Sequence, residues 1–455
     1  MKDQKKITKH QSSKVSRREF MGGAAAAMAF TIIPSHVLAQ PPSEKLNVAS
    51  IGSGGMGGGN TRACAAAGAN IVALCDVDWN RAGDTFKRYP KAKRYKDFRK
   101  MLDNEKSIEA VIVATPDHFH TVAGMAAMRR GKHVYIQKPL TRLVSEARAL
   151  TEAARKYKVV TQMGNQGHSG DGVRDICEWI WAGVIGEVKE VHAWTNRPVW
   201  PQGIGRPTEV HEIPSTLDWD LWIGPAPMRP YNKCYAPFNW RGWWDFGGGA
   251  LADMACHVLD PVFSALKLKY PTSVEACSTK PNNETFPHAS IVRFEFPARE
   301  GLPAVKVNWY DGGMKPPRPA ELEDDRRLNQ ASSNVLFMGT EGVLRCGEYG
   351  DRPQLLPYAR MREFSRNKPP QTLKRIKTGH EGNWIEACKT GGQATSHFDY
   401  SGPFTEMVVM GNLAIRPENV DKKLLWDGDN MKVTNDEKAN DYVNMHYRKG
   451  WSLEM

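Results

Sequence analysis

The first third of the chain alternates short apolar runs with longer amphipathic stretches. We predict buried strands at the apolar runs, which are 46–51, 70–75, 110–114, 133–136 and 159–163. Helical spacing occupies the stretches between them, at 56–67, 79–88, 117–130 and 143–157. Strands that alternate with helices in this way are typical of βαβ units and a parallel sheet. Residues 45–163 are therefore expected to form one α/β domain.

The pattern changes after Gly164, where a helix at 172–182 and a strand at 187–195 lead into a Pro- and Trp-rich loop, 196–245. Alternating runs then predict an antiparallel sheet that is open on one face, with strands at 273–278, 289–296, 304–310 and 333–338. Helices are expected at 250–267, 381–390 and 404–415, surface excursions at 311–332 and 348–378, and a polar tail at the end. We therefore predict a second α/β domain with a large, mostly antiparallel sheet over 164–455, since 455 residues exceed one ordinary core.

The N-terminal segment, residues 1–39, is unlike the rest of the chain. Ser16-Arg17-Arg18-Glu19-Phe20 follows a basic stretch and precedes a weakly apolar run, and Val37-Leu38-Ala39 resembles a signal-peptidase site. These parts in this order resemble a twin-arginine signal, which predicts export of the folded protein to the periplasm. An ordinary amphipathic helix with two chance arginines is the alternative. The apolar run is shorter than the roughly 20 residues of a membrane span, so no membrane anchor is expected after signal removal.

Charge and cysteine spacing exclude two classes of protein. The net charge is +12, of which residues 1–39 contribute +5, and the remaining +7 is spread without a basic run. This balance argues against nucleic-acid binding. The eight cysteines never form a close pair, and the histidines lack the spacing of zinc ligands, so we expect no metal site.

A glycine motif follows the first expected strand. Gly52-Ser53-Gly54-Gly55-Met56-Gly57 fits G-x-G-x-x-G, in which Gly52, Gly54 and Gly57 allow a tight turn, the approach of a pyrophosphate and helix packing. Gly55 and Met56 open the helix whose N-terminus would face the phosphates. Asp76 ends the second strand, where it would accept hydrogen bonds from the ribose hydroxyls and favour NAD over NADP. A glycine-rich turn without a ligand is the alternative, and nearby Arg81 is interpreted as a solvated helix residue.

Two further motifs, Thr115-Pro116-Asp117-His118-Phe119-His120 and Gln137-Lys138-Pro139, follow later strands. With the glycine motif they resemble the Gfo/Idh/MocA family of sugar and polyol dehydrogenases over about residues 45–415. The resemblance implies a Rossmann domain, and a C-terminal α/β domain whose open sheet forms homo-oligomers. It also implies a cofactor frame of Thr115, Pro116, His118 and His120, although His120 as a helix cap is equally compatible. Lys138 would lie beside the nicotinamide and the reacting hydroxyl, while Gln137 departs from the glutamate that is usual in the family.

An Asp/His pair follows a run of glycines. Asp253 and His257 are four residues apart and share one helix face, and by the resemblance they lie against Lys138. We assign His257 as the base, because a neutral imidazole can take the hydroxyl proton at pH 7. Asp253 would bind a substrate hydroxyl, and Lys138 would stabilise the developing oxyanion. A helix cap and a packed histidine are the alternative, and Asp260 is expected to be structural.

Tryptophan is concentrated in one part of the chain, with nine of fourteen between Trp179 and Trp244. Sugars present C–H faces to aromatic rings and hydroxyls to polar side chains, so this segment predicts a saccharide site. The candidate substrate-binding residues are Trp194, Asn196, Arg197, Trp200, Arg241 and Asp253. For any single tryptophan, packing in a core or an interface is the alternative.

Together these features predict NAD-dependent oxidation of a secondary hydroxyl of a sugar or glycoside, with carbon 3 as the first choice. We expect NAD to be tightly bound, because free NAD is scarce outside the cytoplasm. A redox-neutral glycosidase that uses NAD transiently is one alternative, and a non-catalytic sugar or nucleotide sensor is another. The intact set of Lys138, Asp253 and His257 favours an enzyme.

Overall fold

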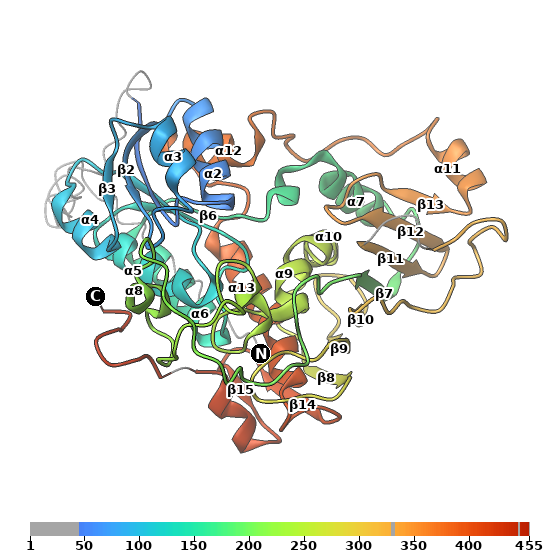
Figure 1. Cartoon of the computed structure of the whole chain (residues 1–455). Helices are drawn as coiled ribbons and strands as arrows, with labels where there is room; N and C mark the ends of the chain where they lie inside the picture. The colour runs from blue at the N-terminus through green and yellow to red at the C-terminus, as the bar shows by residue number, and fades with distance from the viewer. Residues whose placement is uncertain (1–44, 329–332, 445, 455) are drawn as a thin grey trace, which may run out of the picture. The chain divides into compact units, whose positions relative to one another are not determined.

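The computed structural model describes residues 45–328, 333–444 and 446–454. The predicted signal segment lies outside the described residues. Two sheets organise this part of the chain (Figure 1). All eight cysteines are free thiols. Within the described ranges, no helix is long and apolar enough to cross a membrane.

The first sheet is parallel and confirms the predicted βαβ pattern. Its six strands have the order β3-β2-β1-β4-β5-β6. All neighbours are parallel, and the strand order in the sequence switches from descending to ascending between β1 and β4. The strands are β1 (Asn47–Ile51), β2 (Asn70–Cys75), β3 (Lys93–Tyr95), β4 (Ala110–Val113), β5 (His133–Ile136) and β6 (Thr161–Met163). The connecting helices are α2 (Met56–Ala66), α3 (Gly83–Arg88), α4 (Phe98–Asn104), α5 (His120–Arg129) and α6 (Val144–Tyr157). A doubly wound sheet of this order binds ligands outside the carboxyl ends of its strands, at the point of reversal.

The second sheet has nine strands in the order β13-β12-β11-β7-β10-β9-β8-β14-β15, and only β7 and β10 pair in parallel. They are β7 (Val188–Thr195), β8 (Ser273–Ser278), β9 (Ser290–Phe296), β10 (Val305–Tyr310), β11 (Ser333–Gly339), β12 (Gly342–Gly347), β13 (Gln354–Leu356), β14 (Lys423–Asp427) and β15 (Lys432–Val433). Helices α7 (Asp171–Trp181), α9 (Gly249–Val258), α10 (Asp260–Ala265) and α13 (Phe398–Ile415) complete the core of this part. The predicted mostly antiparallel sheet is confirmed.

Several boundaries differ from the prediction. The expected helix at 250–267 is two helices, α9 and α10, and Pro261 opens the second one. The expected excursion at 348–378 contains β13 and α11 (Tyr358–Phe364), and the expected polar tail contains β14 and β15. These strands have two to five residues, too few for a clear period of two, and they are recognised only by the partner strand that they meet.

The C-terminal part of the chain returns to the first sheet. Helix α12 (Gly379–Thr390) packs against α2, where Asn60 donates a hydrogen bond to Glu381 at 2.8 Å (Figure 1). Helix α13 packs against α6, and Arg148 donates two hydrogen bonds of 2.8 Å to the buried carboxylate of Glu406. These contacts hold the first sheet and α9, which follows the glycine run, within one packed unit.

Candidate active site

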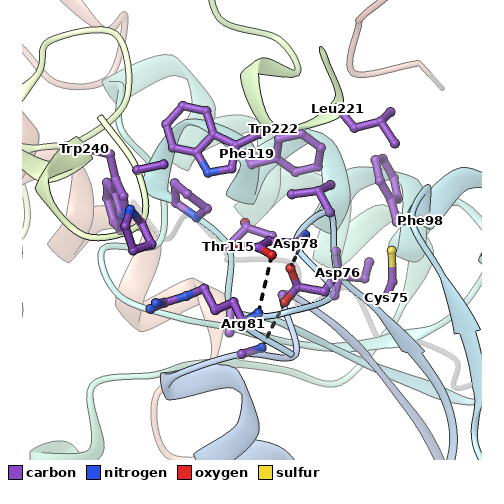
Figure 2. Close-up of a pocket in the computed structure, with 18 of the residues that line it drawn as sticks. Cys75, Asp76, Asp78, Arg81, Phe98, Thr115, Phe119, Leu221, Trp222 and Trp240 are labelled. Atoms are coloured by element: carbon purple, nitrogen blue, oxygen red, sulfur yellow. Dashed lines mark hydrogen bonds between the residues drawn. The ribbon is translucent and has the colours of Figure 1, made fainter. Parts of the chain in front are cut away.

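A pocket opens at the carboxyl ends of the strands of the first sheet. Its empty space is about 1240 Å³ with the open mouth included. One wall is formed by the glycine motif, Asp76, Thr115 and Pro116. The opposite wall comes from the segment after β7 and includes Leu221, Trp222 and Trp240. Figure 2 shows Phe119 and Trp222 across the pocket from Asp76.

The glycine motif is shaped for close approach. Gly52 has a φ of +81°, and a Cβ on it would lie 2.5 Å from the carbonyl oxygen of Ala114. A Cβ on Gly57 would collide with the carbonyl oxygen of Gly52, so this glycine lets the helix meet the strand. Gly54 and Met56 line the pocket, and Gly55 has a φ of +52° immediately before α2. The three predicted glycine roles therefore fit the observed backbone.

Asp76 lies at the end of β2 with only 8% of its surface exposed. Its carboxylate accepts hydrogen bonds from the backbone N–H of Gly54 at 3.0 Å and from that of Asp78 at 2.9 Å (Figure 2). Burial raises the pKa of Asp76 to about 6, and the backbone hydrogen bonds oppose that rise. The side chain is thus fixed beside the glycine loop and faces the pocket, as the dinucleotide site requires.

The Thr-Pro-Asp-His motif contributes to the pocket mainly through its first two residues. Thr115 and Pro116 line the pocket, and Thr115 Oγ1 is buried without a hydrogen-bond partner among the described residues. His118 and His120 are each 1% exposed and do not line the pocket. His120 spans the carbonyl oxygens of Thr115 and Pro139, at 2.9 and 2.8 Å, and His118 spans those of Phe246 and Trp222. Both rings position the pocket loops from behind, which corrects the prediction that they frame the cofactor directly.

Lys138, which lines the pocket, contacts Asp253, which is outside the pocket lining. Lys138 Nζ donates hydrogen bonds of 2.8 Å to Oδ1 and to the backbone carbonyl of Asp253. Arg241 Nε lies 3.2 Å from the same Oδ1. Burial alone would raise the pKa of Asp253, but Lys138 and Arg241 outweigh it and the pKa lies below its usual value. The carboxylate is therefore ionised and holds both cations.

His257 lies one helical turn after Asp253 and is 5% exposed. Its Nδ1 is buried and has no hydrogen-bond partner within the part of the chain that the structure describes. Burial, assisted by the charge of Lys138, lowers the pKa of His257 to about 3. The ring is therefore neutral at pH 7 and free to bond a ligand, although it does not line the pocket itself.

The sequence motif gave no role to Asp117, which the structure places next to this cluster. Its Oδ2 accepts from the N–H of Gly248, which precedes α9, at 3.0 Å. Burial raises the pKa of Asp117 to about 7, and the charges of Arg241 and Lys138 oppose that rise. A carboxylate at a helix N-terminus stabilises the helix, so Asp117 ties α9 to the loop after β4.

The unusual glutamine of the Gln-Lys-Pro motif has a specific partner. Gln137 Nε2 donates to Asn60 Oδ1 at 3.0 Å, and Gln137 Oε1 accepts from the N–H of Lys138 at 3.2 Å. Asn60 in turn donates to Glu381 on α12. The amide of Gln137 supplies a hydrogen-bond donor that an ionised glutamate lacks. A glutamate at this position would also place a second negative charge near Glu381.

Residues 216–241, here called the cover segment, close the outer side of the pocket. The segment runs antiparallel to the residues after β2, because Trp79 N–H donates to Thr216 O and Asp218 N–H donates to Val77 O. Its aromatic residues largely pack on one another, with Trp219 and Trp222 stacked at 4.7 Å. Trp222 and Trp240 also line the pocket. Core packing thus accounts for several tryptophans of this region, while two of them face the candidate ligand.

The predicted substrate residues separate into two groups. Arg241 lines the pocket, 4.2 Å above the ring of Trp240 and 5.8 Å from that of Trp200. Trp194 is 1% exposed and packs with Leu336 in a cluster apart from the main core, so it is a core residue and corrects that prediction. Asn196 and Arg197 bond each other at 3.1 Å and do not line the pocket. Among the described residues, no group of histidine, cysteine and carboxylate side chains is placed to hold a metal ion.

Two family models match the chain. One, described as an oxidoreductase family with an NAD-binding Rossmann fold, matches residues 46–165. The other, the C-terminal alpha/beta domain of that oxidoreductase family, matches residues 184–296. The matched ranges together cover more than half of the chain.

Individual relatives agree with these matches. An inositol 2-dehydrogenase of Salmonella paratyphi B is 29% identical over 186 residues, which are 39% of this chain and 54% of that protein. A levoglucosan dehydrogenase of Pseudarthrobacter phenanthrenivorans is 26% identical over 226 residues, 48% of this chain and 50% of that protein. The chain thus spans about half the length of the curated relatives it matches. Among solved structures, levoglucosan dehydrogenase in complex with NADH and levoglucosan has a similar fold, with a TM-score of 0.56 and 18% identity, covering 84% of this chain and 99% of that one. With its glycine motif, its Lys138–Asp253 pair and both matched domains, the chain belongs to the Gfo/Idh/MocA family of NAD-binding oxidoreductases.

Proposed function

We propose that this protein oxidises a secondary hydroxyl of a sugar or cyclic polyol with NAD. The observation that supports this proposal most directly is the contact of Lys138 with Asp253. Lys138 lines the dinucleotide pocket, and Asp253 lies one turn before His257 on α9. The relatives named as inositol and levoglucosan dehydrogenases support the same class of substrate. A glycoside oxidised at carbon 3 is the specific reaction that we propose within this class.

The pocket residues fit the dinucleotide. The glycine loop leaves room for the pyrophosphate, Asp76 faces the pocket as an acceptor for the ribose hydroxyls, and Thr115 lines the pocket beside them. When bound, NAD accepts the hydride that leaves the carbinol carbon. Lys138, Thr115 and Pro116 line the same pocket and would hold its reacting end.

Side chains of this protein would accept the proton of the substrate hydroxyl and stabilise the negative charge on its oxygen. Lys138 donates toward the substrate oxygen and stabilises the negative charge that develops there. Asp253 keeps Lys138 and Arg241 in place and accepts from a neighbouring substrate hydroxyl. His257, neutral at pH 7, is the group that we assign to accept the hydroxyl proton and pass it to solvent. Burial and the charge of Lys138 lower its pKa to about 3 in the free protein, so it is a weaker base than free imidazole, and proton transfer depends on Lys138 stabilising the developing alkoxide.

We also propose that NAD stays bound between turnovers, with the bound NADH reoxidised in place by hydride transfer to the carbonyl carbon of a second, keto-sugar substrate, which takes up a proton to become an alcohol. The cover segment pairs with the residues after Asp76, and Thr216 Oγ1 adds a hydrogen bond of 3.0 Å to Asp78. The segment also contributes Leu217, Leu221 and Trp222 to the pocket lining, so these contacts would add to those that hold a bound dinucleotide. Export of the folded protein through the twin-arginine route makes such retention necessary, because the cofactor would be loaded before transport.

Lys138→Ala and His257→Ala are each expected to lower kcat by roughly two to four powers of ten, because each removes a group that handles the charge or the proton. NAD affinity should change little. The assay is a screen of methyl glycosides, levoglucosan and inositol, with the product carbonyl located by carbon NMR. Lys156→Ala, a surface change on α6, is the control and should keep wild-type kcat. Near wild-type turnover of His257→Ala would disprove the base assignment.

NAD affinity is expected to fall as the pH drops below about 6. The pKa of Asp76 is about 6 in the free protein, and hydrogen bonds from ribose hydroxyls favour the ionised form, so binding competes with protonation. The loss should approach tenfold per pH unit at most. Titration of NAD-stripped protein from pH 4.5 to 8 measures it. Asp76→Asn should flatten the profile and weaken discrimination against NADP, whereas the exposed control Asp84→Asn should leave both unchanged.

Protein purified without added nucleotide is expected to carry about one NAD per chain through gel filtration, and to lose it only on prolonged dialysis. Thr216→Val, which removes one hydrogen bond of the cover segment, should speed NAD release roughly fivefold, as the loss of about 1 kcal/mol implies. Thr390→Val on α12 is the matched control. Far less than one NAD per chain, with activity that requires free NAD, contradicts retention.

Arg17→Lys combined with Arg18→Lys is expected to keep the protein in the cytoplasm, because the export machinery distinguishes paired guanidinium groups from ammonium groups. Cell fractionation and immunoblotting measure the distribution. A normal periplasmic level of the double variant would refute the export proposal.

A further inference from the structure

The turn between β12 and β13 places an aromatic side chain next to His257. The rings of Tyr349 and His257 have centroids 4.9 Å apart and meet edge to face at 66°. Although Tyr349 touches a buried ring, 38% of its own surface is exposed. Tyr349 lies 92 positions after His257, in a segment that the sequence pattern predicts to be a surface excursion, so no local motif links the two residues.

The position of Tyr349 is fixed from two sides. Gly350, with a φ of +71°, donates its N–H to Gly347 O at 3.1 Å and closes the turn. On the other side Tyr349 packs on Gly167, where an added Cβ would lie 2.9 Å from Tyr349 Cβ. A side chain at position 167 would therefore displace the tyrosine. An exposed ring held in this way forms a rigid surface.

The adjoining His257 is 5% exposed and has one ring nitrogen without a partner among the described residues. Its Nδ1 is buried and unpaired within the described ranges, whereas buried polar groups are normally hydrogen-bonded. Burial raises the pKa of Tyr349 to about 12, and the negative charges of Glu348 and, to a smaller extent, Asp253 add to that rise. Asp253 is therefore close to Tyr349. The phenol is thus protonated at neutral pH, and the ring adjoins the Asp253–His257 face of α9.

We propose that Tyr349 is a specificity-determining residue on which the ring of a pyranose or other cyclic substrate stacks. The substrate's C–H face would lie on the phenol ring, and one of its hydroxyls would reach His257. Linear polyols have no flat face to offer and are selected against. This inference rests on the proposed function, because it requires a sugar at the Lys138–Asp253–His257 cluster.

Substitutions at position 349 separate stacking from packing. Tyr349→Phe retains the ring, whereas Tyr349→Leu retains apolar bulk against Gly167 without it. We expect Leu to raise KM for methyl glucopyranoside about tenfold, with kcat changed less than KM, and Phe to stay within about twofold of the wild type. The half-exposed Tyr157→Leu on α6 is the control. Thermal unfolding and NAD titration should give wild-type values for all three variants.

Direct binding distinguishes the two ways in which the proposal can fail. Saturation-transfer NMR of methyl glucopyranoside on NAD-loaded protein should show contact with the wild type and a weaker signal with Tyr349→Leu. An unchanged KM for Leu, or a loss with Phe equal to that with Leu, overturns the stacking role while oxidation by the wild type persists. A wild type that neither binds nor oxidises any sugar of the screen overturns the proposed function, and the stacking role with it.

Discussion

Lys138 and Asp253 are 115 positions apart, and their contact sets the geometry of the site. Lys138 follows β5 of the first sheet, whereas Asp253 lies on α9, which packs with the second sheet. A lysine and an aspartate that are largely removed from water stabilise each other only at short range, so both elements must be positioned within fractions of an ångström. Two contacts from neighbouring loops provide that positioning. Asp117 accepts a hydrogen bond from Gly248, and the ring of His120 lies between the carbonyl oxygens of Thr115 and Pro139.

The cover segment shows how one run of residues serves both packing and binding. Most of its aromatic rings form a cluster of their own, which gives a segment with little regular structure a stable interior. Trp222 and Trp240 are part of that cluster and also line the pocket. The wall opposite the dinucleotide loop is therefore rigid, although only α8 (Trp219–Ile223) and a short 3₁₀ turn are regular in it. Rigid walls hold ligands in a defined orientation at a smaller entropic cost.

Where the sequence misled, its local signal was short or ambiguous. The strands β12 to β15, at the two ends of the second sheet, have two to six residues, and they are recognised only by the strands they pair with. Trp194 belongs to the same tryptophan-rich region as Trp222, yet it points into a separate core. Composition cannot separate these two cases, because strand register decides which face of a sheet a residue occupies.

Residues close together in the chain were enough to predict five strands of the parallel sheet, the glycine loop, Asp76 and the helix that carries Asp253 and His257, whereas the three-residue strand β3 was not predicted. The predicted features follow from periodicity and spacing, which are direct consequences of backbone geometry. The folded chain was needed to show that Asp117 ties α9 to the β4 loop, that Gln137 pairs with Asn60, and that Tyr349 meets His257. These contacts join segments that are 77 to 131 positions apart, or come from a turn with no motif of its own, and they exist only after both sheets have packed.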